Sequence, residues 1–173
     1  MPALYHLFVV ASLLGPSLAL KWSSLGDKEY TVVYDKMVWL EAQKYCEKLG
    51  GGLAHADTEE RNTFLLSLTD KNTWLYLGAS NAYDKKTWEW HNPLKPMTFK
   101  YWERGEPNNQ TTENCLVYWN SGSEYKWGDF SCVNPLGFIC QRDVQSSDDK
   151  KKSGNYGFRS FERSSQKCIT LCL

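Results

Sequence analysis

The sequence predicts a small α+β domain, because stretches with the alternation of a β-strand occur beside stretches with a helical period. Residues 28–34 alternate and are rich in β-forming residues, so we expect a strand there. Apolar side chains then recur at helical spacing over residues 38–49, and a second helical pattern begins at residue 57. The remaining apolar stretches are short, which favours short strands over further helices.

The two predicted helices each present an apolar face and have recognisable ends. The face of the first consists of Val38, Trp39, Ala42, Cys46 and Leu49. Residues 50–52 are all glycine, which ends this helix because glycine has a low helix propensity. The second helix is expected to start at Asp57, with Glu60 three residues later as in a capping box. Its expected apolar residues are Phe64, Leu65 and Leu68.

A long polar loop interrupts the predicted strands of the second half. The four expected strands cover residues 74–77, 87–90, 115–119 and 137–141. Between the second and the third of these, residues 91–114 are dominated by Pro, Asn, Gly and charged side chains. This stretch is much longer than a simple connection needs, and long loops on a compact scaffold commonly carry function. We therefore expect the functional site in this loop.

Composition and charge are typical of a compact extracellular module. The chain has 173 residues, with 20 basic and 20 acidic side chains and therefore no net charge. This balance argues against a nucleic-acid-binding protein, which would carry a basic stripe. Hydrophobic residues make up 42% of the chain, enough for a core, and the eight Trp and six Cys are typical of small secreted domains.

The start of the chain has the pattern of a secretory signal peptide. Residues 7–14 form an uninterrupted apolar run, and the helix-breaking pair Gly15–Pro16 follows. Ser17 and Ala19 then match the small residues that precede a signal-peptidase cut. The alternative, a membrane anchor, needs about 20 apolar residues. We therefore expect a signal peptide at residues 1–19 and a secreted, extracellular protein without a membrane span.

All six cysteines follow this leader, so in an oxidising compartment they are expected to form disulfides. Four of them form a framework whose spacing leaves all three possible connectivities open: Cys46, Cys115, Cys132 and Cys140. Cys168 and Cys172 lie apart, in a basic, polar tail predicted to cover residues 143–173. They either close a small local ring or link chains into a homo-oligomer, whose linked copies would gain avidity. We interpret the three lysines at 150–152 as a solvated linker rather than a heparin-binding site.

Three short motifs follow one another along the chain: Trp74-Leu75-Tyr76-Leu77-Gly78, Glu106-Pro107-Asn108 and Trp127-Gly128-Asp129. Together with the four framework cysteines, they resemble a C-type lectin domain over residues 28–142, which a short segment at 20–27 precedes. The resemblance implies an α+β fold with two helices, two small antiparallel sheets and a long loop region that holds Ca²⁺. It also implies the disulfides Cys46–Cys140 and Cys115–Cys132. The extra cysteine pair of longer family members is missing, so the chain resembles the short form.

The resemblance implies that the loop binds Ca²⁺ and, through the ion, a sugar. The calcium ligands, which would also contact the sugar, are Glu106, Asn108, Glu113 and Asp129. Three carboxylates and one amide suit a hard cation that takes about six to eight oxygen ligands. A cis bond at Pro107 would turn its two neighbours toward the same ion. Each carboxylate would accept a hydrogen bond from a sugar hydroxyl and the amide NH₂ would donate one, and the Glu-Pro-Asn order implies mannose-type glycans.

Three features of this chain bear on that site. Gly128 stands where the sugar-binding pattern has Asn, so one metal ligand and one amide donor are missing. The positions of the family's auxiliary calcium site fall near Asn81, Lys85, Asn109 and Asn114. The lysine there would repel a cation, so we expect at most one calcium site. Asn109 also begins an Asn-Gln-Thr sequon, which is either glycosylated beside the site or unused.

The sequence contains no catalytic nucleophile motif or metalloprotease motif, so we expect a binding protein rather than an enzyme. The leading prediction is a calcium-dependent lectin for mannose-type glycans on glycoproteins or cell surfaces. The alternative, favoured by Gly128, is a C-type-lectin-like module that binds a protein ligand without calcium. Five tryptophans suggest a sugar-stacking platform, but we expect most of them in the core: Trp74, Trp88, Trp90, Trp102 and Trp127. His91, near the loop, is expected to face solvent.

Overall fold

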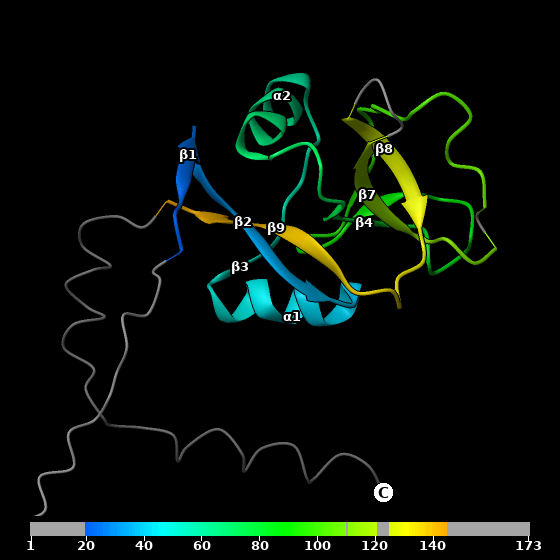
Figure 1. Ribbon diagram of the computed structural model, residues 1–173, viewed down its shortest axis with the longest axis horizontal. Coiled ribbons are helices and arrows are strands. Elements are labelled where there is room, and N and C mark those ends of the chain that lie inside the picture. The colour runs from blue at the N-terminus through cyan, green and yellow to red at the C-terminus, as the bar shows by residue number, and fades with distance from the viewer. Residues whose placement is uncertain (1–19, 110, 121–124, 145–173) are drawn as a thin grey trace, which may run out of the picture.

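The structure, a computed structural model, describes residues 20–109, 111–120 and 125–144 (Figure 1). The predicted signal peptide at residues 1–19 lies outside the described residues, and so does nearly all of the predicted tail, including Cys168 and Cys172. Within the described ranges, no helix is long and apolar enough to cross a membrane.

The described part of the chain forms an α+β fold, as the sequence predicts. Its helices are α1 (Trp39–Lys48) and α2 (Glu59–Leu68). Its strands are β1 (Ser23–Leu25), β2 (Lys28–Met37), β3 (Gly51–Leu53), β4 (Leu75–Ser80), β5 (Glu89–Trp90), β6 (Lys95–Pro96), β7 (Cys115–Asn120), β8 (Tyr125–Phe130) and β9 (Leu136–Asp143). In its described residues, the long predicted loop contains the two-residue strand β6 and an isolated bridge from Trp102 to Trp127.

One connected sheet replaces the two separate antiparallel sheets that the resemblance implies. Its strand order is β1-β2-β9-β4-β5-β6, with β3 paired to β9 and the β7–β8 hairpin paired to β4. Strand β4 joins the two halves, because it pairs with β9 in parallel at Leu75–Gly137 and with β7 in the antiparallel sense at Leu75–Tyr118. The prediction of two sheets is wrong in this respect, since one strand hydrogen-bonds to both halves.

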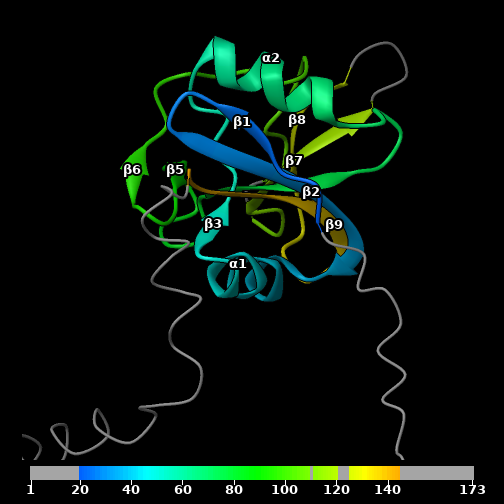
Figure 2. The same ribbon diagram turned by 90° about the vertical axis from the view of Figure 1, so that its left-hand side faces the viewer.

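The two ends of the domain meet in the β2–β9 ladder, where Lys28 lies opposite Asp143. Cys46 on α1 and Cys140 on β9 form a disulfide with a Cα–Cα distance of 5.3 Å, which is one of the pairs that the resemblance implies. Figures 1 and 2 show α1 and α2 on opposite sides of this ladder. Because the disulfide joins residues 94 positions apart, it restricts the unfolded chain and stabilises the fold.

The second helix begins with a different cap from the predicted one. Helix α2 starts at Glu59, and Thr58 is its N-cap, with Oγ1 accepting a hydrogen bond from the backbone N–H of Arg61 at 3.2 Å. The predicted start at Asp57 is therefore wrong. The carboxylate of Asp57 forms ion pairs with Arg61 and Lys95 instead, so it connects α2 to β6.

The glycine run after α1 ends the helix, as predicted, and also lets β3 approach β9 closely. Gly50 has a φ of 88°, which a side chain would strain. Gly51 begins β3 and lies so close to β9 that a Cβ there would be 1.8 Å from the carbonyl oxygen of Gln141. Glycine is required at this position because the two backbones touch.

The core is rich in aromatic side chains, and the five tryptophans differ in how deeply they are buried. Trp90 and Trp127 are completely buried. Trp88 and Trp102 pack against the core and are only partly buried, and Trp74 is partly buried as well. Two of the five are therefore core residues, two more pack against the core, and Trp74 is partly buried outside it.

Candidate functional site

The four predicted calcium ligands line one cavity of about 330 Å³. Glu106, Asn108 and Glu113 come from the long loop, and Asp129 comes from β8. The loop lies beside the β7–β8 hairpin, at the end of the molecule away from β1 (Figure 1). The fold thus brings side chains that are distant in the sequence to one concave surface.

Asp129 ties the loop to the hairpin. Its buried carboxylate accepts hydrogen bonds from the backbone N–H groups of Asn108 at 2.9 Å and of Asn109 at 3.0 Å. The Glu106 carboxylate accepts a hydrogen bond of 2.7 Å from Nδ2 of Asn108 and a longer one of 3.4 Å from the backbone N–H of Asp129. The Glu106–Pro107 peptide bond is cis, as the resemblance implies. These contacts connect three of the four predicted ligands to one another.

The cavity concentrates negative charge. Burial, together with the neighbouring Asp129 carboxylate, raises the pKa of Glu106 to about 7. Burial and the charge of Asp129 also raise the pKa of Glu113. Both shifts reflect carboxylates that are unfavourable in their ionised forms when no cation is close. A cation that entered the cavity would therefore be attracted by all three acidic groups.

The oxygen donors of this set suit calcium chemically, but the side chains do not form a ready-made coordination site. Carboxylate and amide oxygens are the ligands that Ca²⁺ prefers. Among the described residues, no group of three or more His, Cys, Asp or Glu side chains is already arranged to hold a metal ion. The residues that would hold the ion are Glu106, Asn108, Glu113 and Asp129. Water would complete the coordination shell.

An aromatic side chain covers Gly128. A Cβ at this glycine would lie 3.0 Å from the indole Nε1 of Trp119, which comes from the neighbouring strand β7. The rings of Trp74 and Trp119 lie 5.4 Å apart, and that of Phe130 lies 5.0 Å from Trp74. These three rings line the cavity beside the acidic groups. We call Trp74, Trp119 and Phe130 the aromatic wall. Gly128, at the position where the sugar-binding pattern has Asn, therefore lies against this wall.

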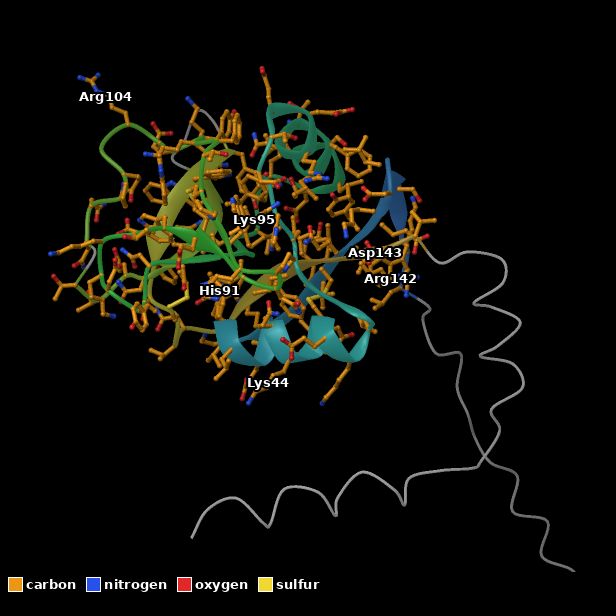
Figure 3. All side chains as sticks on the ribbon, turned by 180° about the vertical axis from the view of Figure 1, so that it is seen from behind. Lys44, His91, Lys95, Arg104, Arg142 and Asp143 are labelled. Atoms are coloured by element: carbon orange, nitrogen blue, oxygen red, sulfur yellow. A yellow bond between two sulfur atoms is a disulfide. The ribbon has the colours of Figure 1, made fainter. Side chains whose placement is uncertain are left out.

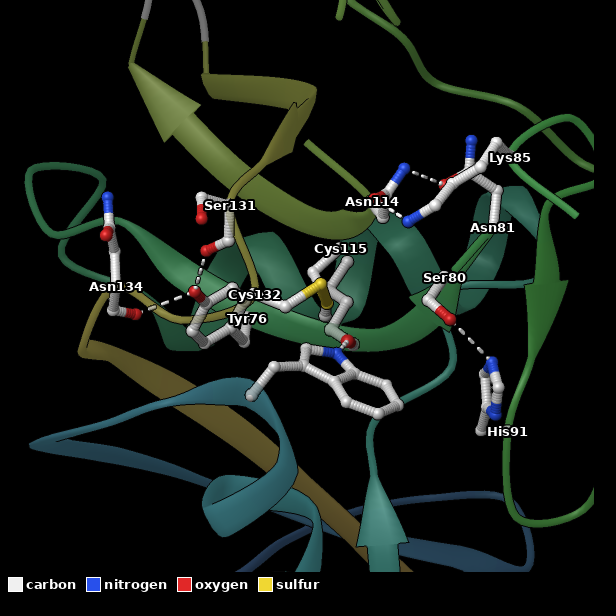
Figure 4. Close-up of a disulfide and its surroundings, with 12 residues drawn as sticks. Tyr76, Ser80, Asn81, Lys85, His91, Asn114, Cys115, Ser131, Cys132 and Asn134 are labelled. Atoms are coloured by element: carbon white, nitrogen blue, oxygen red, sulfur yellow. Dashed lines mark hydrogen bonds between the residues drawn. A yellow bond between two sulfur atoms is a disulfide. The ribbon is translucent and has the colours of Figure 1, made fainter. Parts of the chain in front are cut away.

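The expected auxiliary calcium positions divide between two places. Lys85 donates a hydrogen bond of 2.5 Å to Oδ1 of Asn114, and Nδ2 of Asn114 donates one of 2.8 Å to Oδ1 of Asn81 (Figure 4). We call these three residues the Lys85 cluster. Asn109 instead bonds to Asp129 in the cavity. The cluster therefore contains the lysine that is expected to repel a cation.

The second disulfide, Cys115–Cys132, joins the first residue of β7 to the segment after β8. It is the other pair that the resemblance implies, and Figure 4 shows it with the residues around it. Nearby, the Tyr76 hydroxyl donates toward the carbonyl oxygens of Ser131 at 2.6 Å and Asn134 at 2.7 Å. The base of the hairpin is therefore held by a covalent bond and by β4.

The histidines serve the scaffold. His91 is half-buried: its Nε2 lies 2.8 Å from the Ser80 hydroxyl, and its ring packs edge-on against Trp39 (Figure 4). The expectation that His91 faces solvent is wrong, because the chain after β5 directs it toward β4. His55 is buried, and burial lowers its pKa to about 4. Neither histidine lines the acidic cavity.

Residues 35–142 match the Lectin C-type domain family, and the chain therefore belongs to this family. It is 31% identical over 128 residues to CD209 antigen-like protein D of Mus musculus, and the match covers 73% of this chain and 52% of that protein. The chain thus spans about half the length of this curated relative.

Solved structures with the same fold belong to proteins of different kinds. The carbohydrate-recognition domain of cow CD23, determined in the presence of a GlcNAc2Man3 oligosaccharide, is 27% identical with a TM-score of 0.64, and the match covers 72% of this chain and 95% of that one. Herring type II antifreeze protein is 24% identical with a TM-score of 0.66, covering 72% of this chain and 97% of that one. The second likeness is one of fold alone, so the function has to be argued from the site.

Proposed function

We propose that this protein is a calcium-dependent lectin that binds mannose-type glycans on glycoproteins or cell surfaces. The observation that carries the proposal is the shared cavity of Glu106, Asn108, Glu113 and Asp129. In this proposal the protein is secreted after loss of residues 1–19. Its carboxylates serve binding rather than acid–base catalysis, so it is not an enzyme.

The cavity residues would divide the work of recognition. Bound calcium would supply a Lewis acid on which two neighbouring sugar hydroxyls replace water. Glu106 and Glu113 would each accept a hydrogen bond from a hydroxyl, and Nδ2 of Asn108 would donate one. Nδ2 of Asn108 already donates to Glu106, so the ligand would take over an existing donor. The order of acceptor and donor in Glu-Pro-Asn supports the preference for mannose over galactose.

The aromatic wall would provide the apolar part of the binding energy. Trp74, Trp119 and Phe130 line the same cavity as the carboxylates. Small-ligand sites combine apolar and aromatic walls with a few placed polar groups, which is the composition found here. A sugar ring bound through its hydroxyls would lay its C–H surface against these rings. This contact would offset part of the binding energy that is lost because Gly128 provides neither a metal ligand nor an amide donor.

One observation favours a second candidate, a module that binds a protein ligand without calcium. In the Lys85 cluster the lysine ammonium group donates a hydrogen bond to Asn114, so the expected auxiliary calcium position already contains a positive charge that would repel a cation. If the acidic cavity also binds its ligand without an ion, its aromatic wall and its carboxylates would together suit a peptide surface that is both apolar and basic. The response of binding to calcium separates the two candidates.

Calorimetry with calcium and then with methyl α-mannoside tests the proposal. We expect calcium to bind alone, and the mannoside to bind only after calcium has been added. EDTA should abolish sugar binding, and methyl α-galactoside should bind more weakly than the mannoside. If the folded protein takes up no calcium at millimolar concentration, the lectin proposal is wrong and the second candidate gains support.

Secretion, glycosylation and oligomerisation remain proposals of the same kind. Asn109 is exposed beside the cavity, so a glycan there would stand at the edge of the site and restrict bulky ligands. Mass measurement of the secreted protein before and after glycosidase treatment would show whether the sequon is used.

Gels run with and without reductant would show whether Cys168 and Cys172 link chains.

A further inference from the structure

A second cavity adjoins the first and has the opposite charge. It has a volume of about 580 Å³, within the range of about 300–1,000 Å³ that is usual for small-ligand sites. Its wall includes Glu106 and Pro107 of the site loop, and Glu106 lines both cavities. A ligand held at Glu106 in the first cavity can therefore extend directly into the second.

Two lysines and two tryptophans give the second cavity its character. Lys86 and Lys100 are exposed, and within the described part of the chain neither ammonium group takes part in an ion pair or a side-chain hydrogen bond. Trp88 and Trp102 line the same cavity, with ring centroids 4.9 Å apart. The cavity thus offers positive charge beside partly exposed aromatic surface.

We propose that this second cavity is a subsite for an anionic sugar residue, one that carries a sulfate ester or a carboxylate, next to the sugar in the first cavity. The proposal rests on the proposed lectin function and names the glycan class that it favours. Lys86 and Lys100 would pair with the anionic group, and Trp88 and Trp102 would contact the ring that bears it. Glu106 disfavours an anion close to itself, so the anionic group is placed at the lysine side of the cavity.

The test compares neutral and charged versions of one disaccharide. We would titrate the full chain, in calcium, with α-linked mannobioses that are either unmodified, sulfated on one residue or extended by a sialic acid. Two exposed lysine–anion pairs of ordinary strength should give the charged forms an advantage of about threefold to tenfold. The advantage should shrink with added salt, because exposed charges are screened. The relative gain of the sulfated and the sialylated sugar identifies which anion the subsite takes.

Variants assign the effect to the cavity. Lys86→Ala/Lys100→Ala should lose the advantage and keep the affinity for unmodified mannobiose. Lys44→Ala/Lys48→Ala, on exposed positions of α1, removes the same charge outside the second cavity and should change nothing; Figure 3 shows Lys44 on the helix, well away from Arg104. Arg104→Ala removes an exposed cation from the same loop outside the cavity wall, which separates local pairing from general attraction.

The outcomes distinguish this inference from the function on which it rests. Calcium-dependent binding of unmodified mannobiose without any gain for the charged forms overturns the subsite alone. A gain that persists in Lys86→Ala/Lys100→Ala also overturns the subsite and leaves the lectin function standing. Failure of every sugar to bind overturns both proposals. Binding of only the charged forms, lost in the lysine variant, supports the subsite and counts against the mannose pocket.

Discussion

Two polar clusters meet at the start of β7, and only one of them contains its own cation. Glu113 lines the acidic cavity, whereas the next residue, Asn114, belongs to the Lys85 cluster. In the cavity, burial and the charge of Asp129 raise the pKa values of Glu106 and Glu113. In the Lys85 cluster, an ammonium group bonds to Asn114, and none of its three side chains is a carboxylate.

If the proposed calcium site is correct, the difference shows how one fold can hold an ion in one cluster and not in the other. The lysine of the Lys85 cluster supplies a positive charge at any calcium concentration. A cluster of carboxylates needs a cation from solution to balance its negative charge, so the arrangement of its side chains depends on whether that cation is bound. The following variants test whether the two clusters differ in this way.

The largest effect is expected at Asp129, which bonds to the loop backbone and is a ligand in the proposed calcium site. Asp129→Asn removes a charge and leaves one of the two backbone N–H groups of Asn108 and Asn109 without its acceptor. Calcium affinity should fall at least about 100-fold, since even residues that only support ligands contribute 10- to 100-fold. Unfolding in urea should show a loss of about 1–3 kcal/mol for the unpaired donor.

Asp84→Asn is the matched control for this prediction. Asp84 is exposed and accepts its hydrogen bonds from Lys86 and Thr87 in its own turn, outside both cavities. Calcium binding should be unchanged in this variant. An Asp129→Asn protein that binds calcium normally would contradict the assignment of the cavity as the ion site.

The next largest effect concerns which sugar the cavity selects. Glu106→Gln combined with Asn108→Asp exchanges the positions of acceptor and donor and keeps one carboxylate and one amide. Selectivity should shift from mannose toward galactose by about tenfold, since a hydrogen bond to a charged group contributes about 1.5–3 kcal/mol. Inhibition of binding to immobilised mannan by the two free sugars measures the shift. An unchanged sugar profile would mean that these two residues do not contact the sugar.

The sequence predicted the regular elements where apolar patterning is strong. Both helices and the strands at β2, β4, β5, β7 and β9 were expected, with ends that differ by at most three residues. Strand β8 was missed, because Gly128 and Asp129 lower the β-propensity of its second half. It forms nevertheless, because it pairs in register with β7 from Cys115–Phe130 to Asn120–Tyr125. Tertiary pairing decided what local propensity could not.

The polar residues that line the acidic cavity were predictable from the sequence, whereas two of its three aromatic residues were not. The acidic residues carry motifs that can be read along the chain. Trp119 and Phe130 carry no such motif, since a partly exposed ring on a strand resembles any surface aromatic residue. The contact between Trp119 and Gly128 depends on the register of β7 against β8, which the sequence does not state.

A smaller effect is expected when Gly128 is replaced. Gly128→Asn adds a ligand oxygen and an amide donor, but its Cβ would press on Trp119 at 3.0 Å. Trp119 is partly exposed and can move, so calcium affinity should rise by only about threefold to tenfold. Combining this change with Trp119→Val should raise the gain further by removing the crowding. No gain in either protein would mean that position 128 does not face the ion.

The smallest effect is expected at Lys85, and it tests the comparison from the other side. Lys85→Glu places a carboxylate beside Asn81 and Asn114 and removes the internal cation. A second calcium ion should then bind weakly, with a dissociation constant of about 0.1–1 mM, as in sites with few charged ligands. Stability without calcium should fall by less than about 1 kcal/mol, because Lys85 is exposed.

Lys71→Glu makes this last test specific, because the two lysines are matched in backbone as well as charge. Lys71 has a φ of 58° and Lys85 a φ of 61°, so any strain from the left-handed conformation is shared. Only Lys85 donates to Asn114, so only its replacement should change the number of calcium ions from one to two in equilibrium dialysis. A second ion in both variants would indicate a general effect of negative charge. A second ion in neither would mean that the asparagine pair cannot serve as a calcium site even after the lysine has been removed.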